Sequence, residues 1–231
     1  MLTFEDMRYT QDGFSLHADF TVRDGEMLAV IGPSGGGKST LLNVVAGFLE
    51  PTSGRVLWDG QDLAGTPPGK RPVSILFQDN NLFPHMSVAQ NVGLGLRPDL
   101  RLSAQQKTQV EAALERVGLA GFGARKPAAL SGGQASRVAL ARMLLRGNPL
   151  VLLDEPFAAL GPALKVEMLD LVRDLMGETG ATLMMVSHDP EDAKRIAQRT
   201  VLVADGEALA PVETAEIFAN PPEALQAYLG K

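Results

Sequence analysis

A single glycine-rich stretch, Gly32–Thr40, holds the residues with the most recognisable chemistry. It fits the phosphate-binding pattern G-x-x-x-x-G-K-[ST], between an apolar run and a helical pattern. Glycines let backbone N–H groups converge on phosphate oxygens, and a helix N-terminus adds partial positive charge. We expect Lys38 to reach the β- and γ-phosphates of a nucleoside triphosphate, and the Ser39 hydroxyl to bind Mg²⁺. A plain glycine turn is the alternative, but the Lys-Ser pair argues against it. The predicted nucleotide contacts in this stretch are Gly32, Pro33, Ser34, Gly35, Gly36, Gly37, Lys38, Ser39 and Thr40.

Two adjacent carboxylates, Asp154 and Glu155, follow the apolar run 150–153. A fully apolar run is typical of a strand inside a parallel sheet that is covered on both faces. Such sheets bind ligands at the carboxyl ends of their strands. Asp154 suits Mg²⁺, and Glu155 suits a base that orients or deprotonates a water. Because adjacent strand residues point to opposite faces, different roles for the two are geometrically natural. The alternative is a pair of solvated acids in a turn.

Two more polar residues stand where predicted core strands end. Gln78 follows the strand predicted over 72–77, and His188 ends the one predicted over 182–188. Taken alone, the glutamine is more often solvated and the histidine more often structural. Together with Glu155 they predict one crevice at the carboxyl edge of the sheet.

The segment Leu130, Ser131, Gly132, Gly133 and Gln134 opens another helical pattern. Ser131 is a good N-cap, and the glycines leave the first N–H groups of the helix accessible to an anion. An ordinary cap before an amphipathic helix explains the same residues equally well.

The elements that must position these residues alternate along the chain. Antiparallel strands are predicted over 2–9 and 14–22, before a buried strand at 27–31. Mostly helical sequence from 87 to 147 indicates an inserted helical subdomain, with the core at 1–86 and 148–231. A helix is expected from Pro162 to Met176, ended by Gly177. A hairpin over 200–210 and two short helices close the chain.

Composition narrows the class of protein. The chain has 231 residues, of which 45% are hydrophobic, enough for one domain with a subdomain. A net charge of −6 without a basic run argues against nucleic acid as a partner. The absence of cysteine excludes disulfides, thiolate metal sites and cysteine nucleophiles. Nothing at the N-terminus resembles a signal peptide, and no apolar run approaches the length of a membrane span. We expect any membrane role to come through a partner.

In combination, these motifs resemble those of the ATP-binding subunits of ABC transporters over the full length of the chain. Leu-Ser-Gly-Gly-Gln at 130–134, between the phosphate loop and Asp154, separates that family from other P-loop NTPases. The resemblance implies a P-loop NTPase (RecA-like) α/β core with an antiparallel β subdomain and an inserted α-helical subdomain.

The resemblance also implies roles for individual residues. Tyr9, by itself more typical of a half-buried strand aromatic, would stack on adenine. Gln78 would sense the γ-phosphate and Mg²⁺, Glu155 would be the base, and His188 would contact the γ-phosphate. The implied ligands of Mg²⁺ are Ser39, Gln78 and Asp154. Two copies would pair head to tail, so that residues 130–134 of one complete the ATP site of the other.

A narrower resemblance, to the ATPases of bacterial thiamine importers, rests on residues 71–83, 87–96, 185–189 and 203–206. It implies a peripheral subunit at the cytoplasmic face of the inner membrane. This subunit would bind a transmembrane permease and, through it, serve a periplasmic solute-binding protein. The alternatives are import of iron, sulfate or a polyamine, a non-transport ABC ATPase, and a nucleotide kinase. A kinase would lack Leu-Ser-Gly-Gly-Gln. A non-transport ATPase usually has paired ATPase units, coiled-coil arms or a basic surface.

The sequence departs from the family pattern at two places. The family usually has Ser-Ala-Leu-Asp where this chain has Ala158-Ala-Leu-Gly161, and Arg-Gln-Arg where it has Ala135-Ser-Arg137. The missing aspartate normally helps to couple the two ATP sites. We therefore expect weaker communication between the sites than is typical.

Overall fold

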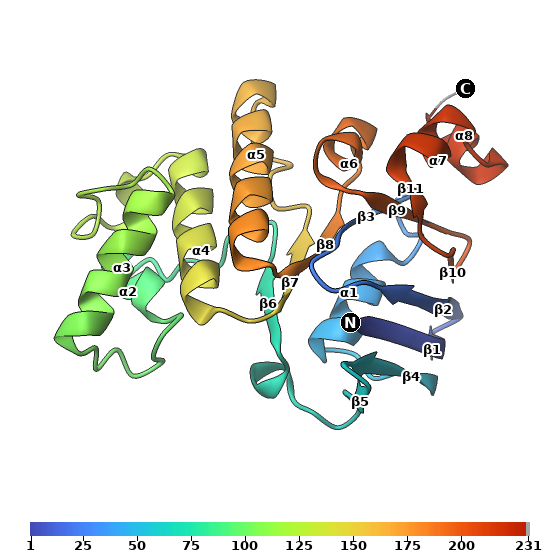
Figure 1. Cartoon of the computed structure of the whole chain (residues 1–231), viewed down its shortest axis with the longest axis horizontal. Helices are drawn as coiled ribbons and strands as arrows, with labels where there is room; N and C mark the ends of the chain where they lie inside the picture. The colour runs from blue at the N-terminus through green and yellow to red at the C-terminus, as the bar shows by residue number, and fades with distance from the viewer. Residues whose placement is uncertain (230–231) are drawn as a thin grey trace.

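The structure is a computed structural model that describes residues 1–229. Within them, one 11-stranded sheet runs in the order β5-β4-β1-β2-β10-β9-β3-β8-β7-β6, with β11 paired to β9 (Figure 1). Its strands are β1 (Leu2–Gln11), β2 (Phe14–Val22), β3 (Met27–Ile31), β4 (Ser53–Trp58), β5 (Gln61–Asp62), β6 (Val73–Leu76), β7 (Leu150–Asp154), β8 (Thr182–Val186), β9 (Arg199–Ala204), β10 (Glu207–Ala208) and β11 (Val212–Glu213). The helices are α1 (Lys38–Ala46), α2 (Val88–Gly93), α3 (Ala104–Arg116), α4 (Gly132–Arg146), α5 (Pro162–Thr179), α6 (Pro190–Ile196), α7 (Thr214–Ala219) and α8 (Glu223–Leu229).

The sheet has an antiparallel part and a parallel part, as the sequence predicts. Strands β1, β2, β4 and β5 pair antiparallel with one another, and β9, β3, β8, β7 and β6 pair parallel with one another. Strands β10 and β11 pair antiparallel with β9. Strand β3 lies inside the parallel part, between β8 and β9. The loop that follows β3 therefore emerges at the carboxyl edge, beside the ends of β7 and β8.

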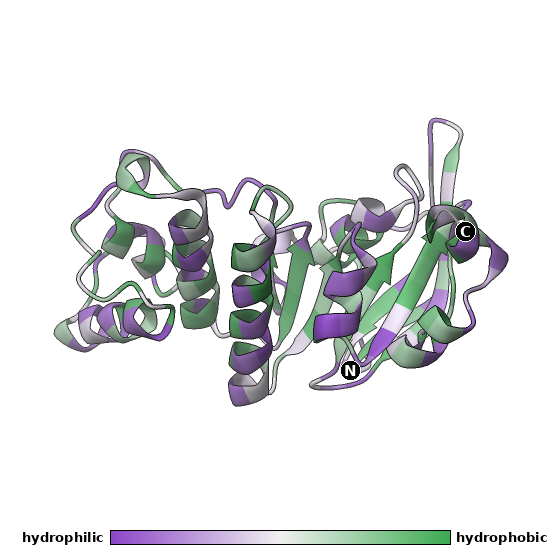
Figure 2. Ribbon diagram, turned by 90° about the horizontal axis from the view of Figure 1, so that it is seen from above, coloured by the Kyte–Doolittle hydropathy of each residue, from purple (hydrophilic) through white to green (hydrophobic). Residues whose placement is uncertain are grey.

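Both faces of the parallel part are covered, which explains its uniformly apolar strands. Along β7, Leu150 and Leu152 pack into a cluster with α1, while Val151 and Leu153 pack with residues of α4 and α5. The alternation follows from the two-residue period of a strand. Figure 2 shows the hydrophobic strands lying between helices whose outer sides are hydrophilic.

The segment between β6 and β7 contains α2, α3 and α4, which gather at one end of the molecule (Figure 1). Each begins with a capping box, in which a serine and a glutamine satisfy each other's backbone N–H groups: Ser87 with Gln90, Ser103 with Gln106, and Ser131 with Gln134. We propose 87–147 as the bounds of an inserted subdomain. No helix among residues 1–229 is both long enough and apolar enough to cross a bilayer.

The predicted end of the helix at Gly177 is wrong. Helix α5 continues to Thr179, and Gly180, with φ of 66°, forms the left-handed C-cap. A glycine inside a helix costs only about 1 kcal/mol, a cost that other contacts can offset. Here Glu178, beyond the glycine, forms an ion pair with Arg116 of α3.

Candidate functional site

The glycine-rich loop joins β3 to α1, and Lys38 is the first residue of that helix. Its ammonium is buried and donates hydrogen bonds to the carbonyls of Gly32 (2.8 Å) and Pro33 (2.9 Å). An ammonium has three N–H donors, so one remains for a phosphate oxygen. Burial lowers the pKa of Lys38, and the carboxylates of Glu155 and Asp154 offset this only in part. An anionic ligand would stabilise the charged form of this lysine.

The loop packs tightly against the neighbouring strand β9. A Cβ on Gly32, whose φ is 144°, would lie 2.0 Å from the carbonyl oxygen of Val203, whereas one on Gly35 would meet nothing within 4 Å. The loop therefore requires glycine at position 32 for space as well as for backbone conformation.

We expect Gly32→Ala to lower the free energy of unfolding by about 3 kcal/mol, because a strand backbone has to shift. Gly35→Ala, the matched control, suffers only the strain of its positive φ, about 1 kcal/mol. Urea denaturation of both variants measures the difference. Equal losses would show that β9 does not constrain the loop.

Asp154, at the end of β7, lies beside the first turn of α1. The Ser39 hydroxyl donates a hydrogen bond to its Oδ1 over 3.2 Å. Burial raises the pKa of Asp154 and the Glu155 charge adds to the rise, while the bond from Ser39 and the charge of Lys38 oppose it. A hydroxyl and a carboxylate oxygen side by side are the ligand types that Mg²⁺ prefers, so these residues fit the ion. Gln78 lies just beyond β6 and is exposed, and its side chain has no hydrogen-bond partner among residues 1–229.

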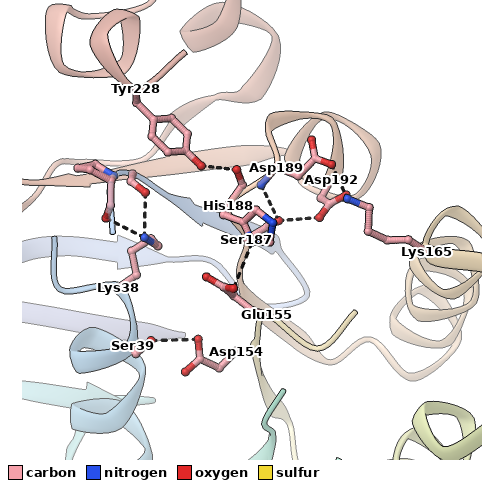
Figure 3. A network of polar contacts seen from close by, with 12 residues as sticks. Lys38, Ser39, Asp154, Glu155, Lys165, Ser187, His188, Asp189, Asp192 and Tyr228 are labelled. Carbon is pink, nitrogen blue, oxygen red and sulfur yellow. Dashed lines mark hydrogen bonds and ion pairs between the residues drawn. The ribbon is translucent and has the colours of Figure 1, made fainter. Parts of the chain in front are cut away.

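Glu155 and His188 meet at the carboxyl edge, as Figure 3 shows. Imidazole Nδ1 lies 3.1 Å from Glu155 Oε2, and 56% of the His188 side chain is exposed. The expectation that Glu155 continues the strand is wrong. Its φ is 47°, and its N–H donates to the carbonyl of Val186 on β8 over 3.1 Å. This bond continues the β7–β8 ladder, and the positive φ then turns the chain out of β7, so the side chain is directed by a left-handed residue and not by strand alternation.

A cavity lies over the phosphate-binding loop. It is lined by Phe14, Ser34, Gly35, Gly37, Lys38, Ser39, Thr40 and Glu155. Tyr9 is not among these residues, because it is 8% exposed in the core, with its hydroxyl bonded to Gln11. Its predicted stacking on adenine stays a prediction. Phe14, to which no sequence motif points, lies against Gly37 at this cavity.

The Leu130–Gln134 segment does not reach this cavity within one chain. Ser131 caps α4 by accepting from the N–H of Gln134, and both Ser131 and Gly132 are exposed. Gly133 is buried, and a Cβ there would lie 2.5 Å from a methyl group of Leu164. The start of α4 thus exposes Ser131 and Gly132 on the outside of the molecule, and we call these two residues the glycine surface.

The two places where the sequence departs from the family pattern contain Gly161, which has open space around it, and Arg137, which makes polar contacts. Gly161 is the N-cap of α5, and a Cβ there would meet nothing within 4 Å. Arg137 donates to the carbonyl of Val117 over 2.8 Å and pairs with Glu167 over 2.7 Å. This arginine thereby joins α4 to the end of α3 and to α5.

Comparisons with known proteins agree with this geometry. The ABC transporter family profile matches residues 16–158. The thiamine import ATP-binding protein ThiQ of Cereibacter sphaeroides is 61% identical over 230 residues, and that of Ruegeria sp. 54%; each alignment covers 100% of both chains. Among solved structures, cbiO1 from Clostridium perfringens, part of the ABC transporter complex cbiONQ, gives a TM-score of 0.85 at 31% identity over 95% of this chain and 90% of that one. A dimeric ATP-binding cassette, MJ0796, in a post-hydrolysis state bound to ADP and Pi, gives 0.78 at 29% identity, covering 93% and 99%.

Proposed function

This chain belongs to the ABC transporter family, and from that premise we propose that it is the ATP-hydrolysing subunit of a bacterial importer of thiamine or thiamine pyrophosphate. The convergence of Lys38, Asp154, Glu155 and His188 at one sheet edge carries the ATPase part of the proposal. The solute part rests on the relatives named for thiamine import, which match the whole chain. Gene neighbours encoding a permease and a thiamine-binding protein would support it.

The residues of the site have distinct tasks in hydrolysis. The loop 32–40 and Lys38 bind the phosphates of ATP, and Ser39, Asp154 and Gln78 would hold Mg²⁺. The ion would neutralise negative charge on the phosphates. Glu155 orients the attacking water and accepts its proton, and His188 contacts the γ-phosphate. Phe14, which lines the cavity, offers an aromatic ring for the adenine, while the stacking of Tyr9 stays a prediction.

A second copy completes each site. The glycine surface at the start of α4 lies outside the cavity of its own chain, and its free N–H groups suit an anion. We assign the γ-phosphate bound by the partner copy to this surface. The dimeric ABC structure among the relatives supports such pairing.

An apolar groove of about 330 Å³ suits a segment of the permease. It lies between the end of α1, β6 and α4, and its rim includes Phe48 and Phe83, which are 51% and 45% exposed. Arg142, whose pKa burial lowers, donates to the carbonyls of Asn80 and Asn81. The groove is therefore fixed to the loop that follows Gln78. This loop, including Met86, would transmit nucleotide occupancy to a permease at the cytoplasmic face of the inner membrane.

Uptake of labelled thiamine by cells that lack the gene tests the proposal. We expect uptake to fall to background and to return with the parental gene. Phe83→Glu should bind ATP normally but fail to restore uptake, because a carboxylate would be buried at the permease contact. Leu209→Glu, at an apolar side chain of similar exposure, should restore it. Undiminished uptake in the deletion strain would contradict the assignment to thiamine and favour iron, sulfate or a polyamine.

The replacement of the usual aspartate by Gly161 makes a separate prediction. Because Gly161 is an N-cap with open space around it, Gly161→Asp should leave the fold intact and change its stability by only a few tenths of a kcal/mol. We expect the variant, measured with its permease, to hydrolyse ATP with a higher Hill coefficient than the parent. An unchanged coefficient and rate would remove the argument that this glycine weakens coupling between the sites.

A further inference from the structure

The segment Ser187–Asp189, which carries His188, is held by polar contacts on the side of α6. The Ser187 hydroxyl donates to Asp192 Oδ2 over 2.6 Å and accepts from the N–H of Asp189 over 3.1 Å. Asp189 in turn caps α6 by accepting from the N–H of Glu191. Ser187 and Asp192 are buried, so their bond is shielded from water. The backbone on each side of His188 is therefore defined by short local bonds.

Lys165 reaches the same segment from α5. Its ammonium forms ion pairs with Asp189 and, over 2.8 Å, with Asp192, and its side chain is only 18% exposed. Burial lowers the pKa of Lys165, but the hydrogen bonds to the two carboxylates outweigh it, so the pKa is raised. The N–H of Lys165 donates to the carbonyl of Gly161 over 2.9 Å, in the first turn of α5. The loop of Gly161 and the loop of His188 are therefore joined through one residue, by the backbone N–H of Lys165 on one side and by its ammonium on the other.

Tyr228 reaches His188 from the last helix. Its hydroxyl donates to the carbonyl of His188, and burial raises its pKa with help from nearby carboxylates, so it remains a donor. Helix α8 is anchored by Leu225, which is fully buried in a cluster with Ala29 and Ile31 of β3. The tyrosine is thus fixed to the strand that leads into the phosphate-binding loop.

We infer that Lys165 and Tyr228 are positioning residues that hold His188 in register with Glu155 and the γ-phosphate. Figure 3 shows the two side chains approaching the His188 segment from different sides. The imidazole is mostly exposed and, among residues 1–229, has one side-chain partner, Glu155, so its place depends on its backbone. A reacting group that is displaced by about 1 Å loses much of its effect on the reaction rate, so contacts that hold the His188 backbone should matter for hydrolysis. The inference rests on the proposed role of His188.

The test compares Lys165→Met, Lys165→Arg, Tyr228→Phe and His188→Ala, each assembled with the permease. We expect kcat for ATP hydrolysis to fall about fivefold in Tyr228→Phe, which loses one neutral hydrogen bond. The kcat should fall about tenfold or more in Lys165→Met, which loses two charge-assisted hydrogen bonds. The KM for ATP should stay within about twofold of the parental value if binding is unaffected. Lys165→Arg should restore most of the rate. Lys194→Met removes an exposed ion pair on α6 and should change nothing.

A second readout is independent of turnover. The chain has three histidines, so ¹⁵N-histidine labelling of the full-length protein gives few ring signals, and His188→Ala identifies the one from His188. We expect this signal to shift in Lys165→Met and Tyr228→Phe but not in Lys194→Met. Unchanged kcat and unchanged ring signals in both variants would overturn the inference. If His188→Ala hydrolyses ATP at the parental rate, the proposed role of His188 fails. The ring signals alone then decide whether Lys165 and Tyr228 hold His188 in place.

Discussion

Replacing Glu155 by glutamine should lower the rate of ATP hydrolysis by at least about 100-fold, the usual contribution of a general base. Glutamine has the same shape and can keep the contact to His188 Nδ1, which lies 3.1 Å from the carboxylate. It cannot accept a proton from water. ATP therefore binds and is not consumed, and two copies should remain closed over two nucleotides. Single-turnover hydrolysis and size-exclusion chromatography with ATP measure both effects.

Glu191→Gln is the matched control for this substitution. Glu191 lies at the start of α6 and pairs with Lys194, with 76% of its side chain exposed. Removing its charge should leave the hydrolysis rate and the oligomeric state unchanged. If Glu155→Gln protein hydrolysed ATP at the parental rate, the base would be another group.

Gly132→Asp should abolish hydrolysis while leaving the isolated chain stable. A Cβ on Gly132 meets only a methyl group of Leu160, at 3.6 Å, so the substitution fits the monomer. A carboxylate in the first turn of α4 is even favourable to that helix. It would stand, however, where the γ-phosphate of the partner's ATP is proposed to bind. We expect a loss of about 100-fold or more, comparable to the removal of an anion-stabilising donor.

The control is the same substitution on another exposed helical glycine. A Cβ on Gly177, inside α5, meets nothing within 4 Å. Gly177→Asp should therefore keep parental activity, while both variants show cooperative unfolding close to that of the parent. Parental activity in Gly132→Asp would mean that the start of α4 does not contact nucleotide.

The parts of the site that could be predicted from the sequence are those built from local signals. Glycine spacing predicts the loop before Lys38, and the Ser131–Gln134 pair predicts the start of α4, because capping involves residues three apart. Uniformly apolar strands predict the covered parallel sheet, and so the edge at which Asp154 and His188 stand.

What the sequence does not predict depends on contacts between distant residues. Glu155 leaves the strand because its backbone takes a φ of 47° even though its N–H stays bonded to Val186 of β8, and no local pattern signals that turn. Phe14, at the start of β2, lies at the cavity over the phosphate loop, and Tyr228 reaches His188 across 40 residues. Helix α5 passes Gly177 and ends only at Gly180, whose φ of 66° provides the left-handed C-cap. None of these features follows from the local sequence preference alone.

The central claim is that each ATP site is shared by two copies, and a mixture of two inactive variants tests it most directly. Lys38→Ala lacks the phosphate-binding lysine. Gly132→Asp has a carboxylate at the start of α4, where the partner's nucleotide is proposed to bind. Each variant alone should therefore be inactive. In a mixed dimer, one site combines the intact loop of one chain with the intact α4 of the other. An equal mixture, assembled with the permease, should recover about a quarter of the parental hydrolysis, since half of the dimers are mixed and each has one complete site. No recovery at any mixing ratio, with mixed dimers demonstrably formed, would contradict the shared site.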